Sequence, residues 1–171
     1  MNNPKEWIVK LYRMKVSIFG IPRLYRTIEA SENCTFDDLH EAIFEAFDRY
    51  DPHLYSFFIT RRDTKNIRSI MDATEITHPQ NVEDMFDPSV KRKSTAKTKI
   101  GGVGLEEKDV FHYWFDFGDD WWHRIRVEKI TETPSKSKKK HIELVKSLGE
   151  APPQYGDYDD GYDDEFDDEF E

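Results

Sequence analysis

Histidine and aspartate side chains that could bind a metal or transfer protons gather around one short stretch of the sequence. Asp116, Asp119 and His123 are close together in the chain, while His40 and His53 lie upstream. Histidine and carboxylate combinations bind divalent metals, and both side chains serve as general acids or bases. The candidate polar site therefore comprises His53, Asp116, Asp119 and His123, and His40 is a further candidate.

A purely structural role for these side chains is the competing interpretation. Aspartates beside a tight turn accept hydrogen bonds from backbone N–H groups, which would occupy Asp116 and Asp119. His123 alternates with apolar residues and can be a half-buried, hydrogen-bonded ring. Asp116 and His123 fall on opposite faces of the expected strands, which speaks against one shared metal. A contact between His53 and His123 would instead favour a site.

The sequence contains no recognised catalytic or cofactor motif. There is no G-x-S-x-G nucleophile motif, and Cys34, the only cysteine, has no histidine beside it. Phosphate-loop and zinc motifs are absent as well. We therefore favour a non-catalytic binding or adaptor protein over a small enzyme or metal-binding protein, and we predict no metal and no cofactor.

A second group of residues could bind a ligand rather than react with it. Trp114, Trp122, Arg124 and Arg126 share one face of the expected strands, and single-stranded nucleic acids stack their bases on aromatic rings beside arginines. Residues 1–150 carry 25 acids and 25 bases, without the basic excess that phosphate binding favours. We therefore expect the two tryptophans to pack against a helix or the 61–108 segment, and nucleic acid is the weaker candidate partner.

A β-hairpin must position most of these residues. Aromatic and apolar residues alternate with polar ones on both sides of the loop, which predicts an aromatic hairpin at Phe111–Glu128. Matching the apolar faces predicts a three-residue loop at 118–120, with Phe115 opposite His123. Asp120 would then take the left-handed conformation that such loops require.

The remaining segments predict an α+β fold. Thr35 and Asp38 have the spacing of a capping box before a helical stripe, which Asp51-Pro52 should end. We expect a mixed or antiparallel sheet with one main helix packed on it and a β-grasp-like start. The expected elements are a hairpin over 12–18 and 23–29, a helix over 35–47, a strand over 53–60 and a short helix near 81–86.

The end of the chain differs in composition from the rest. Residues 157–171 hold ten of the 35 acids and no lysine or arginine, with aromatic residues every three or four positions. Such runs do not bury enough apolar surface to fold. We therefore predict one domain over 1–156 and a disordered acidic tail over 157–171. A protein partner, or the chain's own basic loops at 91–99 and 136–140, could pair with the tail.

No segment predicts contact with a membrane. No apolar run approaches the ~20 residues of a spanning helix, and the first residues lack the features of a signal peptide. A cytoplasmic location is the resulting expectation.

The hairpin sequence resembles the signature of a known family. Residues 113–123 read YWFDFGDDWWH, which is similar to the Y-x-[YF]-D-F-G-D-x-W-x-H pattern of the plasmid pRiA4b ORF-3-like proteins. The resemblance spans roughly residues 10–156, because further segments match in order: 22–26, 35–47 with His40 in place, 53–57 and 149–153. Gln154 and Tyr155 stand where the family has an acidic pair, and the cysteines that often flank it are absent.

The resemblance implies a fold more than a function. It points to an α+β domain whose gene is often carried on plasmids and mobile elements, and whose biochemical role is not established. It therefore agrees with the fold expected from the residues and assigns no activity to the candidate site.

Overall fold

The computed structural model describes residues 6–84, 86–90 and 92–155. In these residues, strands with alternating apolar side chains form an eight-stranded sheet within an α+β fold. The strand order is β5-β4-β3-β6-β7-β1-β2-β8, and only the β4–β5 pair is parallel. The strands are β1 (Trp7–Ile18), β2 (Tyr25–Ser31), β3 (Tyr55–Ile59), β4 (Thr74–Thr77), β5 (Lys93–Ser94), β6 (Val110–Phe115), β7 (Trp121–Ser135) and β8 (Ile142–Leu148). The helices are α1 (Phe36–Ala46), α2 (Ile67–Met71) and the 3-10 turns η1 (Pro79–Asn81) and η2 (Ile100–Gly102).

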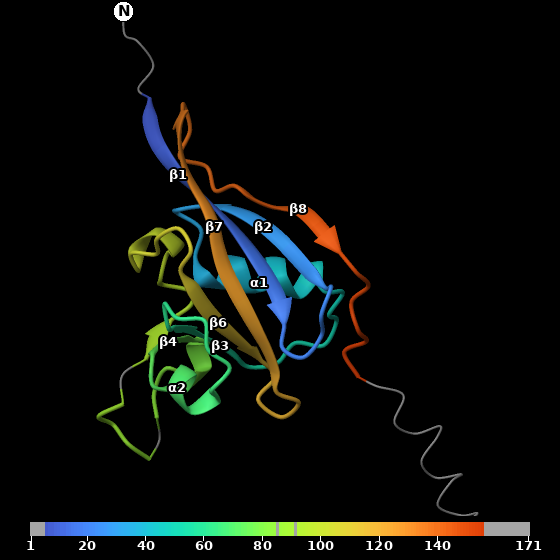
Figure 1. Ribbon diagram of the computed structural model, residues 1–171. Coiled ribbons are helices and arrows are strands. Elements are labelled where there is room, and N and C mark those ends of the chain that lie inside the picture. Colours follow the sequence, from blue (N-terminus) through green and yellow to red (C-terminus); the bar gives the residue numbers. More distant parts are fainter. Residues whose placement is uncertain (1–5, 85, 91, 156–171) are drawn as a thin grey trace, which may run out of the picture.

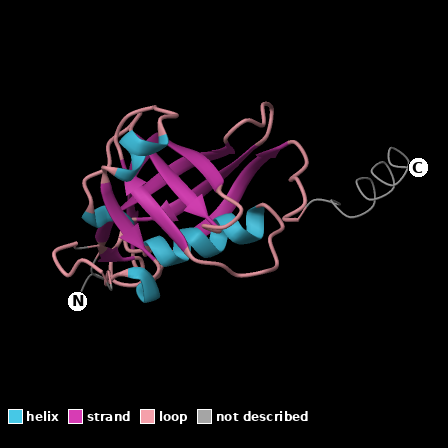
Figure 2. Ribbon diagram, turned by 90° about the horizontal axis from the view of Figure 1, so that it is seen from below, coloured by secondary structure: helices cyan, strands magenta, loops and turns pink. Residues whose placement is uncertain are grey.

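The main helix covers one face of the sheet, as predicted (Figures 1 and 2). Its apolar stripe packs on the buried residues of β1, β2 and the central strands in one large core. The predicted capping box is present: the Thr35 hydroxyl accepts from the Asp38 amide, and the Asp38 carboxylate accepts from the Thr35 amide. The helix ends at Ala46, earlier than predicted, because Asp48 takes a left-handed φ of 55° before the chain reaches Asp51.

A short helix covers part of the other face of the sheet, which we call the outer face. Ile70 of α2 packs on Phe58 and Trp122, whose side chains point away from α1. Figure 2 shows the sheet lying between α1 and this second helix. The prediction that the 61–108 segment covers a tryptophan is therefore confirmed. The predicted helix near 81–86 is wrong, because the described residues there form the end of η1 and a loop.

The central hairpin is confirmed as an element, but its predicted register is wrong. Phe115 pairs with Trp121, not with His123, and the loop runs over the five residues 116–120 instead of three. Asp116 leaves the strand with a φ of 62°, and its carbonyl oxygen accepts a hydrogen bond from the Asp120 amide at 2.7 Å. Asp120 has a left-handed φ of 57°, as expected.

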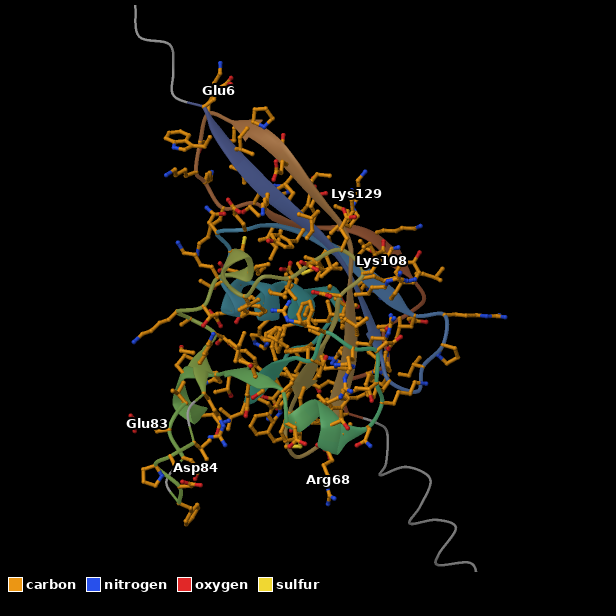
Figure 3. The ribbon with its side chains drawn as sticks, turned by 60° about the vertical axis from the view of Figure 1, so that its left-hand side comes forward. Glu6, Arg68, Glu83, Asp84, Lys108 and Lys129 are labelled. Carbon is orange, nitrogen blue, oxygen red and sulfur yellow. The ribbon has the colours of Figure 1, made fainter. Side chains whose placement is uncertain are left out.

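The chain begins with a hairpin, a helix and a further strand, in the order predicted; the β-grasp-like detail stays a prediction. In Figure 3, Glu6, just before β1, and Arg68 on α2 lie at opposite ends of the described part of the chain. No described helix is long and apolar enough to span a membrane. The predicted acidic tail over 157–171 lies outside the described residues.

Candidate functional site

His123 lies inside the core rather than at a surface. Its Nδ1 is 3.0 Å from the carbonyl oxygen of Trp121 and 3.3 Å from that of Tyr113, so this nitrogen carries a proton and donates it. Burial lowers the pKa of His123 to about 3. The ring is therefore neutral near pH 7, packs in the core and donates one hydrogen-bonding proton from Nδ1. This arrangement favours a structural role for His123.

His40 is also buried and neutral. Its ring stacks on Tyr55 at a centroid distance of 3.6 Å, and its Nδ1 lies 2.7 Å from the Tyr113 hydroxyl. Burial first, and then the nearby His78, lower the pKa of His40 to about 3. The hydrogen bond between His40 and the Tyr113 hydroxyl is buried and joins α1 to β6.

Asp116 is brought to His53, not to His123. One carboxylate oxygen of Asp116 accepts from the backbone amides of Gly118 and Asp119, at 3.1 and 3.2 Å. The other lies 3.3 Å from Nε2 of His53. Asp116 therefore has the predicted structural role of capping the turn, and its second carboxylate oxygen also contacts a candidate site residue, His53.

A phenol and a second carboxylate complete the group around His53. The Tyr155 hydroxyl is 2.7 Å from Nε2 of His53 and donates to Asp51 at 2.6 Å. This bond to Asp51 raises the pKa of Tyr155 to about 12. Since Tyr155 donates to Asp51, Nε2 of His53 donates to Tyr155. Among the described residues, the polar contacts of the His53 ring with Tyr155, Asp51 and Asp116 all involve Nε2.

The segment that departs from the family pattern is built into this region. Gln154 is buried, its side-chain oxygen accepts from the amides of Tyr50 and Asp51, and its nitrogen donates to the Asp51 carbonyl. A glutamate at position 154 has no proton to give the Asp51 carbonyl when ionised. Gln154 therefore fixes the loop that holds Asp51 near His53, and Tyr155 supplies a phenol at a position where the family has an acid.

The tryptophans of the candidate binding surface pack together on the outer face. The rings of Trp114 and Trp122 stack at 5.0 Å with an interplanar angle of 4°, and Phe117 stacks on Trp114 at 4.0 Å. Trp122 is 8 % exposed beneath α2. These rings contribute to the hydrophobic core and are poorly placed to stack on bases.

The arginines of the same candidate surface remain near solvent. Arg124 binds Asp63 through two hydrogen bonds of 2.7 and 2.8 Å, and the bond from Arg124 lowers the pKa of Asp63. Arg126 is exposed. The structure therefore keeps Arg124 and Arg126 on the open part of the outer face and separates them from the buried tryptophan.

Two lysines that the sequence analysis did not select join Arg126 on this face. The strand pairing places Arg126 of β7 beside Lys15 of β1, Lys15 beside Thr27 of β2, and Thr27 beside Lys146 of β8. Directly paired residues point to the same face, and with strands about 4.8 Å apart the row spans about 14 Å. We call Arg126, Lys15 and Lys146 the basic row. Across the described ranges of the chain, none of the three has a carboxylate within 4.0 Å.

A groove of about 540 Å³ adjoins the basic row. All of the charged residues that line it are lysines or arginines. Tyr25 provides aromatic surface there, with Nζ of Lys15 at 4.3 Å and Nζ of Lys146 at 5.8 Å from its ring centroid. We call this hollow the basic groove. Its lining consists of Lys15, residues 17–25, Lys65, Arg124 and Leu148.

The helix on the opposite side of the sheet is acidic. Helix α1 contains the four acids Asp37, Asp38, Glu41 and Glu45, and no lysine or arginine. The acidic helix and the basic row therefore lie on opposite sides of the sheet. The outer face also holds carboxylates, among them Asp63, Glu29 and Glu143, outside the basic row.

The comparisons with known proteins agree with the sequence resemblance. The sequence model of the plasmid pRiA4b ORF-3-like proteins matches residues 10–167. A search of curated proteins found no match. Among solved structures, the chain is similar to a protein of unknown function, MM3350 from Methanosarcina mazei Go1, with 29% sequence identity and a TM-score of 0.61 over 81% of this chain and 70% of that chain. This chain belongs to the family of plasmid pRiA4b ORF-3-like proteins.

Proposed function

We propose that this protein is a non-catalytic binding module that holds single-stranded nucleic acid on the open outer face of its sheet. The observation that carries the proposal is the basic row, in which bases from β7, β1 and β8 line up across the sheet with Thr27 of β2 among them and with no carboxylate of the described residues within 4.0 Å. Proteins bind single strands through a positively charged groove with aromatic rings beside it. The basic row and the basic groove, with Tyr25, have this composition.

Charge separation across the sheet answers the objection that the domain has no basic excess. Long-range attraction depends on the local potential of a face as well as on net charge. The acids of α1 lie on the other side of the sheet and would orient the protein with its basic face toward a polyanion. The cytoplasm, and processes that serve plasmids or other mobile elements, are the setting that we propose for such a module.

A catalytic His/Asp site has less support. In hydrolytic triads the orienting carboxylate and the nucleophile bind different nitrogens of the histidine. Here Asp116, Asp51 and Tyr155 all lie on the Nε2 side of His53. Asp116 is also engaged with turn amides, so the cluster resembles a hydrogen-bonded anchor for the 154–155 segment more than reactive machinery.

Salt-dependent binding of an oligonucleotide tests the proposal. Three phosphate contacts on a single strand give a slope of log K against log salt of about −2, since each contact contributes about −0.7. The assay is fluorescence anisotropy with a labelled oligothymidylate of about twelve nucleotides, titrated from about 50 mM salt upward.

The double variant Lys15→Gln/Arg126→Gln should bind more weakly, with the slope reduced to about −0.7. Lys93→Gln, a neutralised exposed base on β5 at the far edge of the sheet, is the matched control and should leave both values unchanged. Absence of binding at low salt, or an equal loss in the Lys93 variant, would contradict the proposal. So would competition by polyglutamate as strong as that by unlabelled oligonucleotide.

A further inference from the structure

Three potential metal-ligand atoms lie close together on the outer face. Two come from the neighbouring strands β2 and β8, and the third comes from the residue that precedes β8. Glu29 of β2 pairs with Glu143 of β8 in the sheet, and His141 lies just before β8. Nε2 of His141 is 3.3 Å from Oε1 of Glu29 and 3.6 Å from Oε1 of Glu143. One donor atom from each of the three residues lies within 4.8 Å of the others.

The distances from Nε2 of His141 match those between the ligands of a metal ion. An N–H···O hydrogen bond spans about 2.7–3.2 Å, so the 3.3 Å contact with Glu29 is a long hydrogen bond and the 3.6 Å contact with Glu143 lies beyond hydrogen-bond range. Donors around a tetrahedral zinc ion, with bonds of about 2.0–2.2 Å, are separated by about 1.63 times the bond length, or about 3.3–3.6 Å. The two distances from Nε2 of His141 fall in that interval.

The surroundings hold the ligands in position and leave room for the ion. Nη2 of Arg13 lies 3.2 Å from Oε2 of Glu29, so it orients this carboxylate while Oε1 faces His141. The His141 backbone is fixed independently of its side chain: its amide donates to the Ser31 hydroxyl, and its carbonyl accepts from the Ser31 amide. The side chain of Glu143 is 56% exposed, which leaves an open side where water can complete the coordination.

We propose that Glu29, His141 and Glu143 form a three-ligand site for a zinc ion, with solvent in the fourth position. One imidazole and two carboxylates suit first-row divalent metals. Binding through Nε2 places the ring proton on Nδ1. The ion would tie β8, the last strand at this edge, to β2. Residues 29 and 141 are 112 positions apart, so no short sequence motif marks the site.

Isothermal titration of zinc into the full-length, untagged protein near pH 7.5 is the test, since a histidine tag would itself bind the metal. We expect one zinc ion per chain. His141→Ala and Glu143→Gln should each lower the affinity at least about tenfold, because each removes a donor. Glu132→Gln, at an exposed position of β7, is the matched control and should bind like the wild type.

Histidine ring NMR gives a second measurement that does not depend on heats of binding. Zinc should shift the ring signals of His141 among the six histidines and leave His53 unchanged. Circular dichroism checks that each variant folds, and the exposed Glu143→Gln carries the test if His141→Ala unfolds. No zinc binding tighter than about 1 mM, or wild-type zinc affinity in both the His141 and Glu143 variants, would overturn the site. The second result would assign the metal to other carboxylates of the chain.

Discussion

A buried neutral histidine should make the stability of this protein depend steeply on mild acid. The pKa of His123 is about 3 in the folded protein, against 6.5 for an ordinary histidine, because the ring is desolvated. Since the folded pKa lies below the unfolded value, the contribution of the neutral ring is complete above pH 6.5. It is lost progressively as the pH falls from there toward about 3.

The size of this loss follows from the linkage relation. At about pH 4.5 the unfolded histidine is two pH units below its pKa, and one unit is worth about 1.4 kcal/mol, so His123 alone costs about 3 kcal/mol relative to pH 7.5. Any native pKa well below 4.5 gives the same figure. This is a large share of the 5–15 kcal/mol that a typical domain has.

The variant His123→Asn tests this reasoning. Its side-chain amide can still donate toward the Trp121 carbonyl, but it does not titrate. The variant should be less stable near pH 7.5, because it loses packing against Phe47 and Tyr113. The informative quantity is the difference in unfolding free energy between about pH 7.5 and about pH 4.5, from urea unfolding followed by tryptophan fluorescence.

The wild type should lose about 3 kcal/mol more than the variant across this interval. Gln80→Ala, which removes an exposed side chain without a titratable group, is the control and should lose as much as the wild type. Equal losses in His123→Asn and the wild type would refute the argument, because they would mean that His123 is not held neutral by the fold.

Three further predictions concern the chain outside His123. Lys108→Gly should stabilise the protein by about 1 kcal/mol, because Lys108 has a left-handed φ of 74° that glycine adopts without strain; a lower midpoint in urea would contradict this. Asp116→Ala should destabilise it by about 1–3 kcal/mol, since two turn amides lose their acceptor, with Asp119→Ala as the control expected to change little. A chain ending at Tyr155 lacks ten acids and should bind the oligothymidylate more tightly at low salt; unchanged affinity would show that the acidic end does not compete for the basic face.

The sequence predicted the faces of the strands better than their pairing. The true hairpin register differs from the predicted one by two residues, so Phe115 meets Trp121 where His123 was expected. Side chains alternate with a period of two, and a shift of two leaves every residue on its original face. Face matching therefore could not detect the error. The deciding feature is the five-residue turn capped by Asp116, whose carboxylate and carbonyl both accept backbone hydrogen bonds.

Short elements were beyond what periodicity can predict. Helix α2 has five residues, Ile67–Met71, which is less than two turns and too short for an apolar stripe to repeat. Its one local signal is Asn66, whose side chain accepts from the Ser69 amide as a helix cap. The packing of Ile70 on Trp122 stabilises this helix, and that contact joins segments far apart in the sequence.

The polar candidates were separated by the fold in a way that types and spacing could not reveal. His123 and Asp116 were grouped because they are close in sequence, yet one lies in the core and the other pairs with His53. Tyr155 was noted in the sequence only as a departure from the family pattern. Its contact with His53 depends on how the chain returns after β8, which local sequence does not specify.

The sequence alone indicated part of the basic row on the outer face, but not how its residues are arranged. Counted over residues 1–150, acids and bases cancel, and this balance argued against a polyanion as ligand. Counted by face, the predicted strands already placed Lys15, Arg124 and Arg126 opposite the apolar positions, while the predicted helix held acids and no base. Only the strand order was missing, because Lys15 and Arg126 become neighbours when β1 inserts between β7 and β2. Net charge is therefore a poor guide to binding at one face of a sheet, and the charges that neighbouring strands place side by side are the quantity to compare with a ligand.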